Sequence, residues 1–249
     1  MDEATLILSL DTATPGGGVC IVHQQRILAS VVGDANVSHS NTLLRDIDQV
    51  LRATNLSIQN VELFAVSAGP GSFTGLRIGL ATVKALAATL SRPCIGIPTL
   101  HAIARAAGPS PATIAMLPAG RGELFAQLLT VSPKSEVTEG DAATHLPPST
   151  VIAKYTQIVD LIWAGAGAQL YRDLIREGAL ANGIPFEEEM PENDREPGGW
   201  RLAVSEESLA QQIAALALQR FQIGAGNSAE SLRAIYVRPS DPELREQCR

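Results

Sequence analysis

The chain has 249 residues, of which 45% are hydrophobic and 18% charged, and its 19 Lys and Arg against 26 Asp and Glu give a formal net charge of −7. This composition excludes a disordered chain, and the charge balance lacks the basic excess that is typical of a strong independent nucleic-acid binder. The length predicts one large domain or two modest lobes, because a single core seldom grows beyond about 250–300 residues. The acidic start and the short apolar runs predict a cytoplasmic protein without a signal peptide or membrane span. Three cysteines that are far apart fit a reducing compartment.

The first fifth of the chain predicts an antiparallel β-meander. Three apolar runs, Thr5–Asp11, Val19–Val22 and Arg26–Val32, are separated by turn residues. A helix is expected next over Asn41–Ala53, with Ser40 or Asn41 as its N-cap. Its apolar residues recur at helical spacing on one face: Leu43, Leu44, Ile47, Val50 and Leu51.

Strands and helices then alternate, which predicts an α/β domain with a mixed sheet. The expected strands are Leu63–Ala68, Cys94–Ile97, Thr113–Leu117 and Glu123–Val131, and the expected helices are Leu76–Leu90 and Leu100–Ala107. A turn is expected at Pro118–Gly122, between the last two of these strands.

The polar stretch Ser132–Ser149 is interpreted as a linker, which divides the chain into an N-terminal lobe, 1–131, and a smaller C-terminal lobe, 132–249. The second lobe predicts the strands Leu161–Ala164 and Ala234–Val237 and the helix Gln169–Glu177. A further helix capped by Ser205 is expected to run to about Gln222 and to stop at Gly224.

The most distinctive motif is Ser67–Gly79, in which three glycines lie between a predicted strand and a predicted helix. Glycine permits close backbone approach, and a helix N-terminus favours an anion, so Gly69, Gly71 and Ser72 are candidate phosphate-binding residues. The segment lacks the Gly-Lys-Ser/Thr of a Walker A loop and the glycine spacing of a dinucleotide fold. On composition alone, a tight strand–helix connection is favoured over an anion site.

Asp11 and Thr12 end the first predicted strand and are candidates for the same nucleotide site. A carboxylate there can hold a hydrated metal ion, and a hydroxyl can meet phosphate oxygens. The simpler alternative is that Asp11 forms a turn and Thr12 ends a strand.

No metal site is expected in this sequence. His39 precedes the first predicted helix, but Thr42 and Leu43 occupy the positions at which a helical site would place a second histidine. Cys20 and Cys94 are interpreted as small core residues.

The order of four motifs resembles the TsaB family, which belongs to the bacterial machinery for threonylcarbamoyl-adenosine in tRNA. The motifs are Asp11–Thr14, Ser38–Ser40, Gly69–Gly79 and Gly96–Leu100, and the similarity extends to about Glu123. The resemblance implies an actin-like ATPase (ASKHA) fold of two lobes, each with a mixed sheet flanked by helices.

The resemblance also implies a non-catalytic subunit that pairs with its paralogue TsaD, or with a second copy, through the two helices that follow His39 and Gly75. TsaD holds metal through an H-x-x-x-H pair, of which Leu43 replaces the second member here. The implied contact residues are Leu43, Leu44, Ile47, Leu51, Thr74, Arg77, Ile78, Ala81 and Ala85. The ATPase TsaE would act on the pair. The complex, and not the single chain, would bind tRNA, and ATP, ADP or Mg²⁺ would be held only at the level of the complex.

The sequence departs from the family pattern in two places. Pro118–Arg121 stands where family members carry Asp-Ala-Arg/Lys before Gly122-Glu123, and the acidic segment Pro185–Gly199 has no counterpart. This acidic segment predicts a solvated loop.

Two other functions remain as alternatives. The first is an actin-fold small-molecule kinase that uses Asp11 and the Gly69–Gly75 loop, although a second Mg²⁺ carboxylate is missing from the motifs. The second is an independent tRNA binder, which the acidic balance disfavours even though arginines gather near the end of the chain. These arginines are Arg233, Arg238, Arg245 and Arg249.

Overall fold

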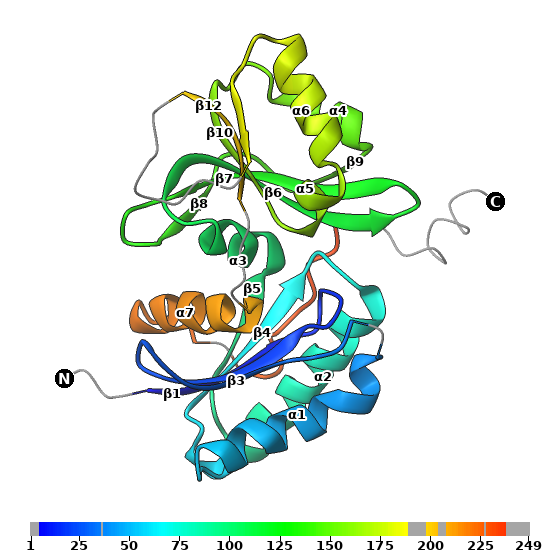
Figure 1. Ribbon diagram of the computed structural model, residues 1–249. Helices are drawn as coiled ribbons and strands as arrows, with labels where there is room; N and C mark the ends of the chain where they lie inside the picture. Colours follow the sequence, from blue (N-terminus) through cyan, green and yellow to red (C-terminus); the bar gives the residue numbers. More distant parts are fainter. Residues whose placement is uncertain (1–4, 36, 189–197, 204–207, 227, 238–249) are drawn as a thin grey trace.

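The computed structural model describes residues 5–35, 37–188, 198–203, 208–226 and 228–237. They form two sheets, each covered by helices on both faces, and two helices lie between the sheets (Figure 1). The expected mixed α/β architecture is therefore confirmed. The predicted Ser205 cap, most of the acidic segment and the arginines from Arg238 onward lie outside the described residues.

The first sheet has the strand order β3-β2-β1-β4-β5. Its first three strands pair antiparallel, and β4 and β5 then add in parallel. The predicted meander and the strands that follow it are confirmed within about a residue. The strands are β1 (Leu6–Asp11), β2 (Gly18–His23), β3 (Arg26–Val32), β4 (Leu63–Gly69) and β5 (Cys94–Pro98).

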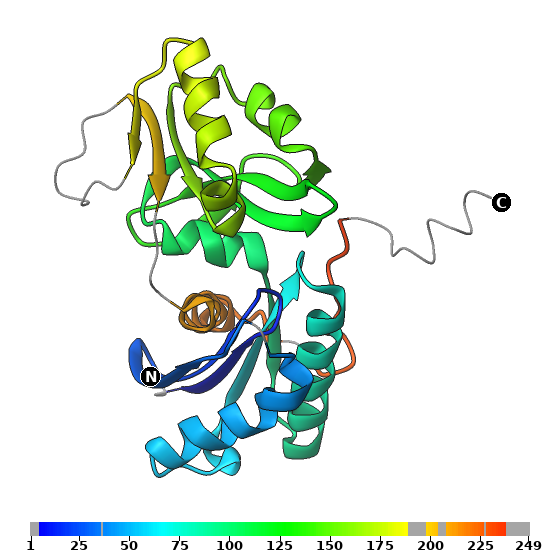
Figure 2. The ribbon, with the colours of Figure 1, turned by 45° about the vertical axis from the view of Figure 1, so that its right-hand side comes forward.

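Three helices cover this sheet. One face packs against α1 (His39–Ala53) and α2 (Phe73–Leu90), and the other packs against α7 (Leu209–Gln222). Alternate residues of a strand point to opposite faces, so Leu8 packs toward α1 and α2 whereas Ile7 packs toward α7. Figure 2 shows α7 almost end-on between the two sheets.

The second sheet has the strand order β11-β12-β10-β6-β7-β8, and β9 also pairs with β7. Its central strand β10 runs parallel to both β6 and β12. The strands are β6 (Ser110–Gly120), β7 (Glu123–Val131), β8 (Val137–Glu139), β9 (Thr144–Leu146), β10 (Asp160–Ala164), β11 (Phe186–Glu188) and β12 (Gly199–Ala203).

The helices of the second sheet also lie on both of its faces. The outer face carries α4 (Pro148–Lys154), α5 (Ala166–Leu170) and α6 (Arg172–Ala181), around the buried pair Trp163 and Trp200. The inner face carries α3 (Thr99–Ala106), which packs against α7 and thereby joins the two halves of the molecule.

This arrangement corrects the predicted lobe boundary. The predicted N-terminal lobe, 1–131, includes β6 and β7, which belong to the second sheet, and α7 from the predicted C-terminal lobe covers the first sheet. The stretch Ser132–Ser149 is not a plain linker, because β8, β9 and the start of α4 lie within it.

Several element ends also differ from the prediction. Helix α2 begins at Phe73, one turn before Leu76, and the expected helix Gln169–Glu177 is divided between α5 and α6. The N-cap of α1 is Ser38, not Ser40 or Asn41. Residues Ala234–Val237 form no strand, and only the Ile235 amide donates to the Ala68 carbonyl oxygen, at 2.7 Å.

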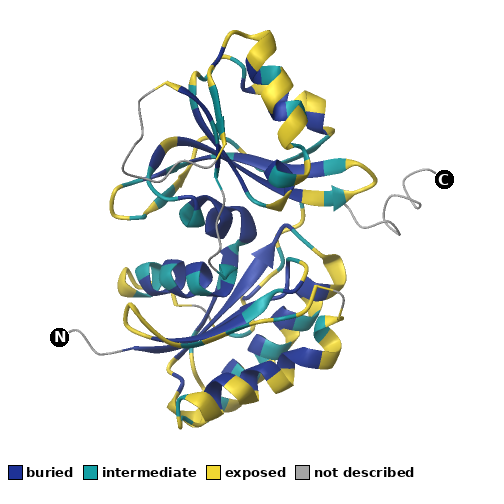
Figure 3. Cartoon of the chain, viewed as in Figure 1, coloured by how far each residue is buried: buried dark blue, intermediate teal, exposed yellow. Residues whose placement is uncertain are grey.

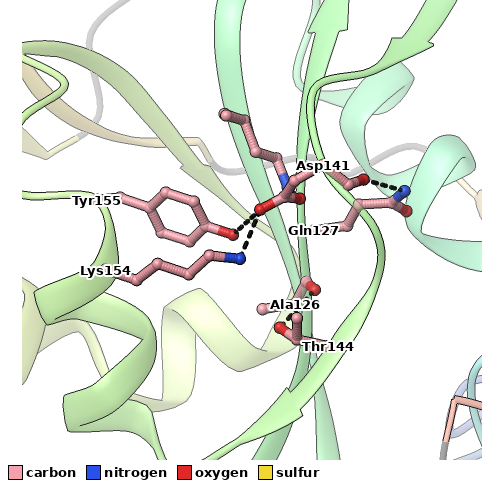
Figure 4. A network of polar contacts seen from close by, with 7 residues as sticks. Ala126, Gln127, Asp141, Thr144, Lys154 and Tyr155 are labelled. Atoms are coloured by element: carbon pink, nitrogen blue, oxygen red, sulfur yellow. Dashed lines mark hydrogen bonds and ion pairs between the residues drawn. The ribbon is translucent and has the colours of Figure 1, made fainter.

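A polar network fastens α4 to the second sheet (Figure 4). The Asp141 carboxylate accepts hydrogen bonds from the Tyr155 hydroxyl at 2.7 Å, from Lys154 Nζ at 2.6 Å and from the Leu128 amide at 2.8 Å. Burial and the neighbouring Asp141 carboxylate raise the pKa of Tyr155, so its hydroxyl stays a donor. Every member of this network is engaged within the fold, which indicates a structural role.

Among the described residues, α2 is the one helix that is long and apolar enough to cross a bilayer by length and composition. Its buried residues nevertheless pack against the first sheet, and Arg77 and Lys84 interrupt its apolar surface. We therefore interpret α2 as a sheet-covering helix with an open apolar side.

Candidate functional site

Asp11 lies at the carboxyl end of β1 and is buried. One carboxylate oxygen accepts from the Ala13 amide at 2.9 Å, and the other accepts from the Thr14 hydroxyl. Burial raises the pKa of Asp11, and the hydrogen bonds from Thr14, Ala13 and Ser67, together with the nearby His39, partly oppose this rise. These bonds hold the turn after β1, so the carboxylate is already occupied in organising the backbone.

The glycine-rich segment closes onto that same turn. The Ser72 amide donates to the Ala13 carbonyl oxygen at 2.8 Å, and the Ser72 hydroxyl caps α2 by accepting from the Gly75 amide at 3.2 Å. A Cβ at Gly71 would lie 2.6 Å from the Ala13 carbonyl oxygen, and one at Gly75 would overlap the carbonyl oxygen of Thr12. These glycines therefore permit one backbone to pack directly on another.

Four of the five candidate phosphate-binding residues thus come together: Asp11, Thr12, Gly71 and Ser72. Gly69 faces elsewhere, because a Cβ there would overlap the Ile235 carbonyl oxygen. The amides of Ala13, Ser72 and Gly75 are already bonded within the chain. This geometry favours the tight-connection interpretation over an open phosphate cradle, and nucleotide binding at these residues stays a prediction.

A cavity of about 360 Å³ lies between the two halves, beside Thr14. Its walls include Ile103, Leu117 and Leu209, and Thr14 and Gln169 supply its polar side chains. No charged side chain lines it among the described residues. The described part of its wall therefore offers no charged side chain to a nucleoside triphosphate or its Mg²⁺, which need both cationic and acidic partners.

His39 stands at the start of α1, where its Nε2 lies 3.0 Å from the Thr14 carbonyl oxygen. The next position that could complete a helical metal pair holds Leu43, whose side chain is packed in the core of the first lobe. Within the described part of the chain, no group of three or more metal-ligating side chains is present.

The predicted partner surface on α1 and α2 divides into buried and exposed residues. Leu43, Ile47 and Leu51 fill the core of this chain, with at most 9% of their surface exposed. This corrects the expectation that they contact a partner, because their apolar stripe is already covered by the sheet. Leu44 is 72% exposed, although it was expected on the same face. On α2, Ile78 is half-buried and the other predicted contact residues are exposed: Thr74, Arg77, Ala81 and Ala85. Figure 3 shows buried, intermediate and exposed residues alternating along the helices that cover the first sheet.

An aromatic cluster that was not predicted from the sequence extends this surface. The Arg77 guanidinium lies 3.8 Å above the ring of Phe73, and the Tyr236 ring is 5.6 Å from that of Phe73. Phe73 was expected in a loop because the helix start was placed at Leu76. The sequence signal near Tyr236 is the short apolar run Ala234–Val237, which predicted a strand and not an exposed aromatic contact.

The segment that departs from the family pattern forms the tip of the β6–β7 hairpin. Pro118 and Gly120 lie on β6, so the turn itself is shorter than expected. Arg121 and Gly122 adopt positive φ, and His145 Nε2 lies 3.0 Å from a carboxylate oxygen of Glu123. Of the acidic segment, Glu187 and Glu188 lie on β11.

Comparison with known proteins supports this description. The sequence profile of TsaD, described as tRNA N6-adenosine threonylcarbamoyltransferase, matches residues 30–177. A curated protein of Haemophilus influenzae named tRNA threonylcarbamoyladenosine biosynthesis protein TsaB is 35% identical over 107 residues, which cover 43% of this chain and 44% of that protein. The matched regions span about half the length of the first curated relatives, 48% and 44%.

Solved structures show the fold. YeaZ from Pseudomonas aeruginosa superposes with a TM-score of 0.70 at 24% identity, over 93% of this chain and 99% of that one. The ROK hexokinase of Thermus thermophilus superposes with a TM-score of 0.52 at 12% identity, over 88% of this chain and 100% of the hexokinase. Together they confirm the actin-like ATPase fold. Because the TsaD profile matches more than half of the chain and the curated relatives are named TsaB, the chain belongs to the TsaB and TsaD family.

Proposed function

We propose that this chain acts in the synthesis of N6-threonylcarbamoyladenosine in tRNA as a non-catalytic scaffold that pairs with TsaD. The relatives named for this biosynthesis support the pathway. The observation that carries the scaffold role is the open apolar side of α2. Only a third of this apolar helix is buried in the chain, and Ala81, Ala85 and Ala88 lie exposed along it.

Small exposed side chains allow a second helix to approach closely, and burying apolar surface drives such association. The neighbouring helix α1 adds the exposed Leu44 on the same side of the first sheet. We expect the pair to form through these two helices and the matching helices of TsaD, with a second copy of this chain as the competing partner. TsaE is then proposed to act on the pair in the cytoplasm, with tRNA, ATP, ADP and Mg²⁺ met only by the complex.

A non-catalytic role also agrees with the interior of the fold. The Asp11 carboxylate is bonded to its own turn, and the cavity between the two halves has apolar walls. A kinase would need carboxylates free to hold Mg²⁺ and a base beside the acceptor. Phosphoryl transfer by the isolated chain that Asp11→Asn abolishes would contradict the scaffold proposal.

The proposal is tested by light-scattering mass after gel filtration of the chain mixed with TsaD. We expect a one-to-one complex that Ala85→Arg and Leu44→Asp each weaken at least tenfold, because a buried charge at a packed interface is costly. Leu180→Asp is the matched control, since Leu180 is 80% exposed on α6 in the second half. Unchanged pairing of folded Ala85→Arg, or an equal loss in the control, would reject the helix surface.

A further inference from the structure

The segment 228–237 crosses from the first half of the molecule to the second. Leu232 is buried in the core that the first sheet forms with α1 and α2, where its side chain packs close to Gly96. Val237, farther along the segment, packs against the core around α3 and the second sheet. Figure 2 shows the end of this segment in red, between α2 and the second sheet. We call residues 228–237 the crossing segment.

The backbone of the crossing segment is fixed to the end of β4. The Ile235 amide donates to the Ala68 carbonyl oxygen at 2.7 Å. A Cβ at Gly69 would lie 2.4 Å from the Ile235 carbonyl oxygen, so the absence of a side chain at Gly69 permits this close approach. Side chains between Leu232 and Val237 are therefore presented by a backbone that is held at both ends and in the middle.

This backbone presents an apolar patch beside the start of α2. Phe73 is 37% exposed, Ile235 40% and Tyr236 53%, and the Tyr236 ring lies 5.6 Å from the Phe73 ring. Single exposed apolar side chains are ordinary, whereas a contiguous group of them indicates a contact surface. We call Phe73, Ile235 and Tyr236 the aromatic patch.

The aromatic patch is continuous with the exposed side of α2 that is proposed for pairing. Phe73, Arg77, Ala81 and Ala85 are exposed and follow one another at four-residue spacing, so they lie along one side of the helix. The alanines let a second helix approach closely, and the rings at the other end offer it a large contact area. A partner helix that lies on Ala81 and Ala85 and continues past Arg77 therefore reaches the aromatic patch.

Arg77 gives this end of the surface a preference for negative charge. Its guanidinium lies 3.8 Å above the Phe73 ring, so the stacking uses the flat face of the group and leaves the N–H groups at its edges. Within the described part of the chain, the Arg77 guanidinium makes no hydrogen bond or ion pair. A guanidinium in this state can bind a carboxylate through two parallel hydrogen bonds.

We infer that Phe73, Arg77 and Tyr236 are the energetic centre of the pairing surface and bind an aspartate or glutamate of TsaD, with apolar side chains of the same TsaD helix against the two rings. The identity of the partner rests on the proposed function. The inference adds the crossing segment to a surface otherwise built from α1 and α2. Tyrosine and arginine are the residue types in which interface energy concentrates, and a fixed backbone lowers the entropy lost on binding.

The inference is tested by isothermal titration of TsaD with the full chain and its variants. We expect Tyr236→Ala and Arg77→Glu each to weaken binding about tenfold or more, and Tyr236→Phe to stay within about twofold of the wild type, because the ring and not the hydroxyl makes the contact. The wild-type Kd should rise with salt concentration more steeply than that of Arg77→Gln, which lacks the charge.

Two variants distant from the pairing surface serve as matched controls. Ile223→Ala removes an exposed apolar side chain at the end of α7, and Arg172→Glu makes the same charge change as Arg77→Glu on α6. Losses in Tyr236→Ala and Arg77→Glu, with both controls near the wild type, support the inference. Equal losses in the controls would overturn it, because the effect would then not be local.

The remaining outcomes separate this inference from the proposed function. Unchanged binding by folded Tyr236→Ala, while Ala85→Arg still prevents pairing, would overturn the inference and leave the scaffold role standing. No complex between the wild type and TsaD would reject the proposed function and the inference with it. A homodimer that Tyr236→Ala disrupts, with TsaD binding intact, would overturn the assignment to TsaD and identify a second copy of this chain as the occupant.

Discussion

Two glycine-bearing turns of this molecule use glycine for different reasons. In the connection from β4 to α2, Gly71 and Gly75 press against the backbone of Ala13 and Thr12. At the tip of the β6–β7 hairpin, a Cβ on Gly120 or Gly122 would meet nothing within 4 Å, yet both residues adopt positive φ. The first turn needs the absence of a side chain, and the second needs a backbone conformation.

The comparison explains why a glycine-rich motif alone does not establish a phosphate loop. Glycines that expose amides to a ligand leave open space beside the backbone. The space beside the glycines of the first turn is instead filled by the end of β1. The hairpin tip has the open space but lies where Pro118 and Arg121 depart from the family pattern. Among the described residues, neither turn therefore combines open backbone amides with an acidic side chain that is free of hydrogen bonds to its own turn.

Replacing Gly75 by alanine should give the largest effect on stability. The new Cβ would overlap the Thr12 carbonyl oxygen, which is backbone and cannot rotate away. We expect a loss of about 3 kcal/mol or more in the free energy of unfolding, at the upper end of overpacking costs. Urea denaturation of the purified chain measures it. A loss below about 1 kcal/mol would show that the turn has room, and would restore the open-cradle interpretation.

The matched substitution at the other turn, Gly122→Ala, should be milder. Here the only cost is a positive φ of 76° for a residue with a Cβ, which is about 1–2 kcal/mol. The same denaturation experiment compares the two variants directly. Equal losses at Gly75 and Gly122 would remove the distinction between a packing glycine and a conformational one.

Sequence reasoning succeeded where structure follows from local patterns. The strands β1 to β5 and the helices between them show apolar alternation or helical spacing within short windows. The structure brings the motif residues Asp11 and Ser72 to the same turn, because parallel strands β1 and β4 end at the same edge of the sheet, and their role as nucleotide ligands stays a prediction. What these residues do there depends on packing distances that no pattern encodes.

The sequence failed where pairing is non-local. The prediction ended the first lobe at residue 131, but β6 is held in the second sheet by parallel pairing with β10, nearly fifty residues later. The short strands β11 and β12 lie on either side of a polar segment. Their sequences therefore show little apolar periodicity, even though Trp200 is completely buried. Leu44 shows that prediction from sequence is also limited for a single residue. Helical spacing alone could not distinguish the residues of α1 that face the sheet from those at the edge of that face.

The smallest expected effect concerns the carboxylate beneath the first turn. Burial raises the pKa of Asp11 above its ordinary value of 3.8, so protonation favours the folded state. This contribution is fully present below pH 3.8 and is lost as the pH rises through the raised pKa of the folded chain. The hydrogen bonds from Thr14, Ala13 and Ser67 lower the pKa and so oppose the rise.

Asp11→Asn removes this titration while keeping an oxygen that can accept from the Ala13 amide. The free energy of unfolding of the wild type should therefore decline relative to the variant as the pH rises above 3.8 and through the raised pKa, as measured by urea denaturation at a series of pH values. Taking the difference between the two chains cancels the titration of groups that they share. Parallel profiles would mean that Asp11 ionises as readily in the fold as in water, and the closed turn would then have to admit solvent. A declining difference would place the carboxylate inside the packed turn, where its hydrogen bonds from Ala13 and Thr14 organise the backbone.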